Sequence, residues 1–84
     1  MRPRLLLLTR PGCELCEELE IELMSHFGSE TFDVSHADVD SDPEWRRRYG
    51  LKIPVLLADD GELLCSVRLD VDVVQAHLNS CAKP

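Results

Sequence analysis

The chain has 84 residues, of which 44% are apolar, and a formal net charge of −7. This length suits one domain, residues 1–84, and the apolar content is too high for a disordered chain. The negative charge argues against a nucleic-acid partner, because phosphates would be repelled. The apolar run from Leu5 to Leu8 is too short for a signal peptide or a membrane span, so we expect a cytoplasmic protein.

The first two elements expected are a buried strand and an amphipathic helix. The four leucines from Leu5 to Leu8 form a continuous apolar run, which predicts a strand buried on both faces. After Cys13 the apolar residues recur at every fourth position, with glutamates between them, until Gly28. These apolar residues are Leu15, Leu19, Leu23 and Phe27. The spacing predicts a helix that begins at the first cysteine.

The middle of the chain predicts a second strand and a short helix. Residues 31–39 alternate apolar and polar positions, as a half-buried strand does. Ser41 and Glu44 have the spacing of a capping box, in which each side chain satisfies a free backbone donor. We therefore expect a helix from there to Tyr49, ended by Gly50.

The last third of the chain predicts a β-hairpin and a final helix. Residues 53–57 and 62–67 flank the turn sequence Asp-Asp-Gly at 59–61, in which the glycine adopts a positive φ. Asp70 can cap a helix whose apolar face carries Val71, Val74, Leu78 and Cys81. The resulting order, β-α-β-α-β-β-α, predicts an α/β fold with a four-stranded mixed sheet and helices on both faces.

The chemistry is expected at Cys13 and Cys16, which form a C-x-x-C motif between a buried strand and a helix. A thiolate at a helix N-terminus is stabilised by unpaired N–H groups and the helix dipole, by up to about 2 kcal/mol. We therefore interpret Cys13 as the nucleophile and Cys16, one turn further along, as the resolving thiol. The alternatives are a structural pair or half of a zinc site, but the second C-x-x-C or closely spaced histidine pair that zinc sites usually have is absent from the sequence.

Three further positions bear on this interpretation. Cys65 and Cys81 are 16 positions apart and are expected to be packed thiols, with no metal bound. Pro54 lies at the start of a predicted strand, where the missing N–H is tolerated. Most prolines there are preceded by a trans bond, but the combination with a C-x-x-C pair favours a cis bond.

Three segments, residues 9–16, 38–44 and 49–55, resemble glutaredoxins, and the closest resemblance is to a bacterial family of small glutaredoxin-like proteins. The resemblance implies a thioredoxin-like fold. It also implies a cis bond before Pro54 and a backbone at Ile53 that pairs with a bound peptide or with glutathione.

The same resemblance assigns substrate-binding roles to two basic residues. Arg10 matches the basic residue that favours the thiolate, and Lys52 is placed to pair with a substrate carboxylate.

The chain also departs from the glutaredoxin pattern. Glu14 and Leu15 stand between the cysteines where glutaredoxins usually have proline and tyrosine, and the carboxylate disfavours a neighbouring thiolate. Residues 65–68 replace the glycine pair that approaches glutathione in that family, so side chains stand where backbone is expected. Glutathione is therefore a candidate co-substrate rather than an assured ligand.

Together these features predict a monomeric dithiol oxidoreductase that reduces disulfides in protein substrates or mixed disulfides with glutathione. We expect no bound cofactor and no nucleic-acid or membrane partner. One alternative is a binding module that keeps the fold without catalysis. Another is iron–sulfur carriage through Cys13 and glutathione.

Overall fold

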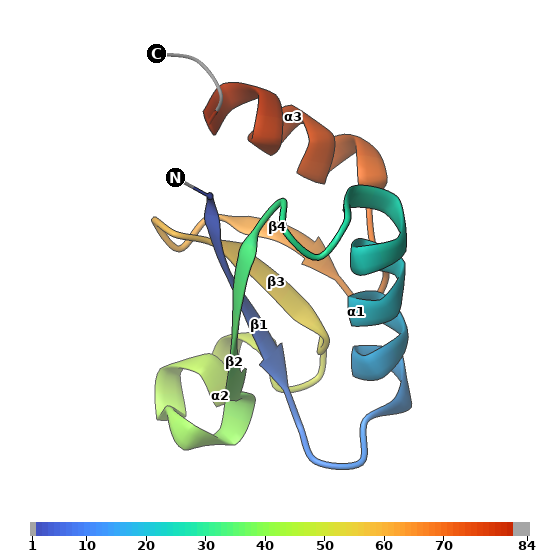
Figure 1. Cartoon of the computed structure of the whole chain (residues 1–84). Helices are drawn as coiled ribbons and strands as arrows, with labels where there is room; N and C mark the ends of the chain where they lie inside the picture. The colour runs from blue at the N-terminus through green and yellow to red at the C-terminus, as the bar shows by residue number, and fades with distance from the viewer. Residues whose placement is uncertain (1, 82–84) are drawn as a thin grey trace.

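The computed structural model describes residues 2–81, with only the backbone for Cys81, and shows an α/β fold (Figure 1). The strands are β1 (Arg4–Thr9), β2 (Asp33–Asp38), β3 (Val55–Ala58) and β4 (Leu63–Ser66). The helices are α1 (Glu14–Phe27), α2 (Pro43–Tyr49) and α3 (Val71–Cys81), and a 3-10 turn, η1 (Val39–Ser41), precedes α2. The predicted order of strands and α-helices is confirmed.

The four strands form one mixed sheet in the order β2-β1-β3-β4. β1 is parallel to β2 and antiparallel to β3, and β3 is antiparallel to β4. Successive residues of β1 face opposite sides, so Leu5 and Leu7 join one apolar cluster and Leu8 joins the other. All three are at most 2% exposed, which confirms a strand buried on both faces.

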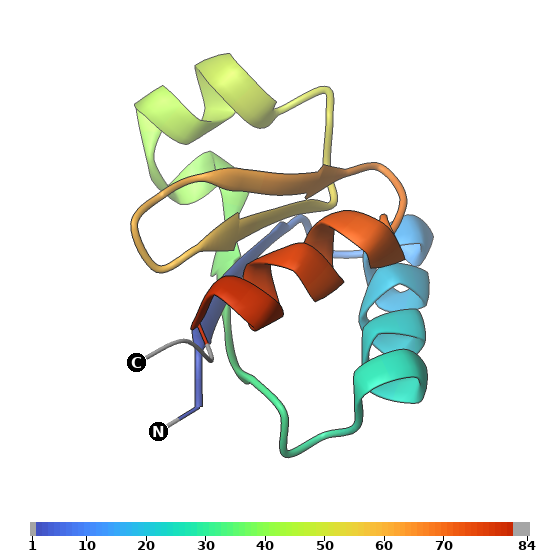
Figure 2. The ribbon, with the colours of Figure 1, turned by 90° about the horizontal axis from the view of Figure 1, so that it is seen from above.

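Helices cover both faces of the sheet. Figures 1 and 2 show α1 and α3 on one face and α2 on the other. Leu19 and Leu23 of α1 and Val74 of α3 are buried against the first face. Trp45 and Tyr49 of α2 pack on the second. None of the described helices is long and apolar enough to cross a membrane.

The predicted capping box before α2 is wrong. Asp42 is the N-cap, and its carboxylate accepts the N–H groups of Glu44 and Trp45 at 2.8 and 3.4 Å. Ser41 instead belongs to η1, and its hydroxyl donates to the carbonyl of Asp38. The 3-10 turn takes up Ser41 and moves the start of the helix one residue further along the chain.

The prediction that Leu15 faces the core is also wrong, since its side chain is 46% exposed. The buried stripe of α1 consists of Cys16, Leu19 and Leu23. Because Cys16 takes the core position in the first turn, Leu15 is rotated toward solvent beside it. The other predicted helix ends hold, including Gly28 after α1 and an Asp70 carboxylate that accepts the N–H of Val73 at 3.2 Å. The strands expected at residues 31–39, 53–57 and 62–67 are shorter or shifted, and span 33–38, 55–58 and 63–66.

Candidate functional site

The topology brings the residues singled out by the sequence to one end of the sheet. β1 ends at Thr9, and the loop that carries Cys13 follows it. β3 is antiparallel to β1 and begins directly after Pro54. β4 is antiparallel to β3, and the N–H of Val67, just past its end, donates to the carbonyl of Pro54 at 2.8 Å. The cysteine loop, Pro54 and Val67 therefore lie at the same sheet end.

Cys13 is the N-cap of α1. Its backbone is extended, with φ −85°, and its Sγ accepts the N–H of Cys16 at 3.2 Å. The turn before it is closed by a bond from the Cys13 N–H to the carbonyl of Arg10, with Gly12 at φ 78°. The sulfur thus takes the place that serine or aspartate usually occupies at a helix start, where donors favour negative charge.

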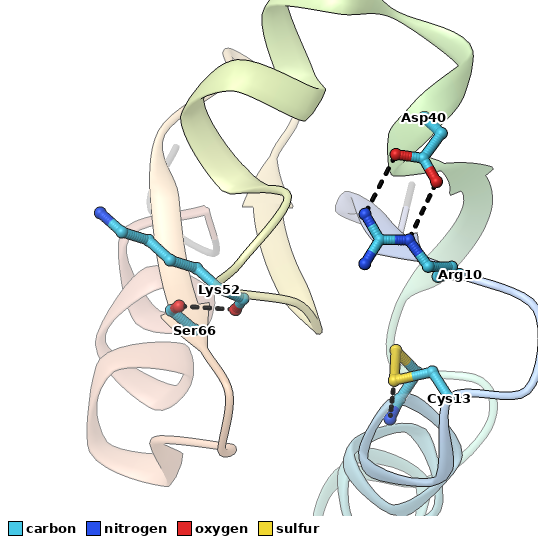
Figure 3. The surroundings of a disulfide bond; sticks show 6 residues. Arg10, Cys13, Asp40, Lys52 and Ser66 are labelled. Atoms are coloured by element: carbon cyan, nitrogen blue, oxygen red, sulfur yellow. Dashed lines mark hydrogen bonds and ion pairs between the residues drawn. A yellow bond between two sulfur atoms is a disulfide. The ribbon is translucent and has the colours of Figure 1, made fainter.

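Cys13 and Cys16 form a disulfide, with their Cα atoms 5.3 Å apart (Figure 3). The two residues differ in exposure. Cys13 is half-buried, whereas Cys16 is only 4% exposed on the core side of α1. An external sulfur therefore reaches Cys13 more readily than Cys16, which is the asymmetry that the assigned roles require.

Arg10 is held by an ion pair at the edge of the site. Its guanidinium donates to both carboxylate oxygens of Asp40, at 2.9 and 3.0 Å (Figure 3). The hydrogen bonds and charge of Arg10 hold the pKa of Asp40 below its usual value. Arg10 also lines a pocket of about 230 Å³ together with Cys13 and Cys16. It therefore acts beside the sulfurs as one half of a neutralised pair rather than as a free cation.

Lys52, Ile53 and Pro54 connect α2 to β3, and the Ile53–Pro54 peptide bond is cis. Within the described residues, the backbone N–H and C=O of Ile53 have no hydrogen-bond partner, so both can pair with another chain. The carbonyl of Lys52 accepts the hydroxyl of Ser66 at 2.8 Å. The side chain of Lys52 extends away from the disulfide (Figure 3). The structure does not bring the Lys52 ammonium to the cysteines.

Sequence reasoning missed two features of this end of the sheet. Val67 has a φ of 70°, and a bond from the N–H of Arg68 to the carbonyl of Ser66 at 2.8 Å closes a γ-turn around it. The glycine pair that the resemblance places in this segment was the signal for a positive φ here. Asp40 was missed because it lies 30 positions from Arg10, and only the pairing of β1 with β2 brings them together.

Cys65 differs from Cys13 in its surroundings. It lies in β4, is 4% exposed, and its Sγ accepts the N–H of Asp70 at 3.3 Å. Burial raises the pKa of the Cys65 thiol, and the hydrogen bond from Asp70 offsets part of this rise. The prediction of a packed thiol is confirmed for Cys65, whereas the side chain of Cys81 lies outside the described part of the chain.

A metal site needs several ligating side chains close together. Within the described residues, no group of three or more His, Cys, Asp or Glu side chains is arranged to hold a metal ion.

Known relatives share the sequence pattern of this chain. It is 39% identical over 66 residues to "Uncharacterized protein Mb0520" of Mycobacterium bovis and, to the same extent, to "Uncharacterized protein Rv0508" of Mycobacterium tuberculosis. Each match covers 73% of this chain and 68% of the relative.

Solved structures share its fold. The solution NMR structure of protein Ne2328 from Nitrosomonas europaea is similar with a TM-score of 0.82 and 31% identity, over 92% of both chains. A mutant thioredoxin from Halobacterium salinarum is similar with a TM-score of 0.60 over 98% of this chain and 76% of that chain. At 23% identity, that second likeness shows the fold alone.

A family match extends from β1 into α3 and includes both cysteines of the C-x-x-C motif. Residues 4–79 match the family described as "Glutaredoxin-like domain (DUF836)". With the thioredoxin-like fold and the Cys13–Cys16 pair at the start of α1, the chain belongs to this glutaredoxin-like family.

Proposed function

We propose that this protein is a dithiol oxidoreductase that reduces disulfides, with Cys13 as nucleophile and Cys16 as resolving thiol. The observation that carries the proposal is the disulfide across the first turn of α1, with one sulfur near the surface and one in the core. A disulfide stabilises a fold less as its loop shortens, so a pair separated by 3 positions contributes little to folding. A redox role accounts for the pair better than a structural one.

The proposed reaction begins with the reduced protein. The Cys13 thiolate attacks one sulfur of a substrate disulfide, forms a mixed disulfide and expels the other substrate sulfur as a thiolate. Cys16 loses its proton to water and attacks the Cys13 sulfur, which releases the second substrate thiolate. The substrate gains two electrons, and the protein is left with the Cys13–Cys16 disulfide that the structure contains.

The cycle closes when a second thiol reagent returns the two electrons. A low-molecular-weight thiol such as glutathione, or another dithiol protein, can attack the Cys13–Cys16 disulfide and regenerate both thiols. This cycle requires a reducing compartment, and we propose the cytoplasm as its setting.

Local donors and charges act on Cys13 in opposite directions. The N–H of Cys16 points at the sulfur and the helix dipole favours a thiolate. Glu14 and Glu17 in the first turn of α1 disfavour it. We therefore propose a nucleophile of intermediate reactivity rather than a strongly activated one.

The segment before β3 is the proposed docking site for the substrate backbone. The unpartnered N–H and C=O of Ile53 can form two hydrogen bonds with an extended peptide. Such a peptide would lie along the sheet end that carries the cysteine loop. We propose proteins with accessible disulfides as the main substrates and glutathione as a co-substrate.

A redox titration tests this proposal. Four proteins are compared: wild type, Cys13→Ser, Cys16→Ser and the control Cys65→Ala. Each is equilibrated in buffers with varied ratios of reduced to oxidised glutathione and then alkylated, and its mass is measured by mass spectrometry. We expect wild type and Cys65→Ala to form one reversible internal disulfide, which both site variants lose. Cys16→Ser is expected to accumulate a mixed disulfide on Cys13. If neither site thiol exchanges faster than an ordinary cysteine, the binding-module alternative replaces this proposal.

A further inference from the structure

A groove lies next to the cysteines, between the first half of α1 and the segment that follows β4. It has a volume of about 370 Å³. Figure 2 shows the segment after β4 passing close to the start of α1. α1 contributes Leu15, Glu18 and Glu22 to the groove, and the other wall is formed by residues 67–69. The groove shares no lining residue with the pocket at Cys13 and Cys16, but one of its walls begins at Leu15, which lies between the two cysteines in the sequence.

The groove presents apolar side chains to solvent. Leu15 is 46% exposed and Val67 is 39% exposed, one on each side. Leu69, which also lines the groove, is half-buried and packs against the core. Paired exposed apolar side chains beside a reactive disulfide fit a partner that contributes an apolar side chain of its own.

The backbone of Val67 is held in a conformation that its side chain disfavours. A φ of 70° is readily adopted by glycine but is costly for a β-branched residue. Two bonds fix it, one from its own N–H to Pro54 and one from the N–H of Arg68 to Ser66. The isopropyl group therefore stands as a rigid wall of the groove.

Negative charge borders the apolar walls. Glu18 and Glu22 lie one turn apart on α1 and are exposed, and within the described residues neither belongs to an ion pair. Arg68 is the single positive charge among the lining residues. The chain as a whole has a net charge of −7, so the field around the groove favours cations.

We propose that this groove selects polypeptide substrates in which an apolar residue and a lysine or arginine lie next to the disulfide. The apolar side chain would pack between Leu15 and Val67, and the cation would face Glu18 and Glu22. Glutathione carries two carboxylates and no apolar side chain, so it is poorly matched to this surface. The inference rests on the proposed function, since it names the substrate class of that same site.

A single-turnover assay tests the charge preference. Reduced protein, freed of reductant, is mixed with symmetric disulfide dimers of two short peptides in which leucine flanks the cysteine together with either lysine or glutamate. Released thiol is measured by chromatography after an acid quench. Each rate is divided by the rate of dithiothreitol with the same peptide, which removes the peptides' own reactivity.

We expect the lysine peptide to react about tenfold faster than the glutamate peptide at low ionic strength, and the ratio to approach one in about 1 M salt. In the double variant Glu18→Gln, Glu22→Gln, the rate ratio of the lysine peptide to the glutamate peptide should fall by about fivefold. The control Glu30→Gln, Asp59→Asn makes the same change in net charge at exposed positions away from the groove and should keep it.

A second pair of variants tests the apolar wall. The same assay compares a peptide that has leucine beside its cysteine with one that has serine there. Leu15→Gln should reduce the rate ratio of the leucine peptide to the serine peptide by about threefold. Ile21→Gln, at a 65% exposed position of α1 that does not line the groove, should leave that ratio unchanged.

The outcomes separate this inference from the function on which it rests. If wild type reduces both charged peptides at equal normalised rates, the groove does not select charge and the inference is overturned. The same conclusion follows if the groove variant and its control lose the preference equally, because net charge alone would then explain it. If wild type reduces none of the peptides, the proposed oxidoreductase function itself fails.

Discussion

Cys13 and Cys65 carry the same functional group in opposite surroundings. Cys13 caps α1 near the surface, where a backbone N–H points at its sulfur. Cys65 lies within β4 among apolar side chains, and burial raises the pKa of its thiol. The contrast teaches that position relative to a helix N-terminus and to solvent, rather than residue type, decides how accessible a thiol is and how well its thiolate is stabilised.

The largest expected difference between the two thiols is in reaction rate. In the reduced protein at pH 7, iodoacetamide should modify Cys13 about a thousandfold faster than Cys65, because the buried thiol is protonated and reacts only when the fold opens. Quenched samples digested and mapped by mass spectrometry give both rates. The Cys16→Ser variant assigns the fast phase to Cys13. Equal rates for the two thiols would remove the basis of the comparison.

The second expected difference is in stability. Cys65→Ala removes a buried sulfur and leaves the N–H of Asp70 without its acceptor, which should lower the free energy of unfolding by about 1–3 kcal/mol. Cys13→Ser should change it by less than about 0.5 kcal/mol in the reduced protein, because serine is a good N-cap. Urea unfolding of the reduced variants measures both values. Similar losses would mean that Cys13 also has a structural role.

The strands and helices around Cys13 and Cys65 could be predicted from the sequence because they depend on local patterns. The leucine run of β1 and the spacing of cysteines before α1 were sufficient to predict the buried strand, the helix start and the position of the cysteine pair at that start. The local rules failed where two of them competed. Ser41 was placed at a helix cap because its spacing fits, but η1 takes it up and Asp42 caps the helix instead.

The parts of the site that could not be predicted depend on long-range structure. The ion pair of Arg10 with Asp40 exists only because β1 and β2 pair in parallel. The positive φ of Val67 arises where β4 leaves the sheet, bonded to Pro54. Neither Arg10 nor Val67 indicates its arrangement by its own residue type, since both arrangements require the register of the whole sheet. For Val67 the signal was indirect and came from the glycine pair that the resemblance places in its segment.

The raised pKa of Cys65 predicts a smaller, pH-dependent difference. A thiol whose pKa is raised above its ordinary 9.0 by folding contributes stability below that pH, and the contribution is lost as the pH rises through the folded value. The stability gap between wild type and Cys65→Ala should therefore narrow as the pH rises above the ordinary thiol pKa of 9.0. Urea unfolding at several pH values in reducing buffer measures the gap. A constant gap would show that Cys65 does not titrate differently in the two states.

The smallest expected effect concerns the charge pair beside Cys13. The charge of Arg10 is neutralised by Asp40. Asp40→Asn should leave the Arg10 charge uncompensated and speed alkylation of Cys13 at pH 7 by about twofold. Arg10→Gln should slow the same reaction by a similar factor, because it leaves the carboxylate unpaired near the sulfur. Both rates are measured with iodoacetamide in the Cys16→Ser background.

An ion pair elsewhere in the chain supplies the matched control for this last effect. Arg47 and Glu44 form an ion pair on α2, with 2.7 Å between a guanidinium nitrogen and a carboxylate oxygen, and neither lines the pocket at the disulfide. Arg47→Gln and Glu44→Gln change the net charge as the site variants do and should leave the Cys13 rate unchanged. Opposite effects of Arg10→Gln and Asp40→Asn mean that the pair acts on the thiolate through charge. If both variants slow Cys13 equally, the pair instead holds the cysteine loop in place, and the reactivity of Cys13 depends on the helix N-terminus alone.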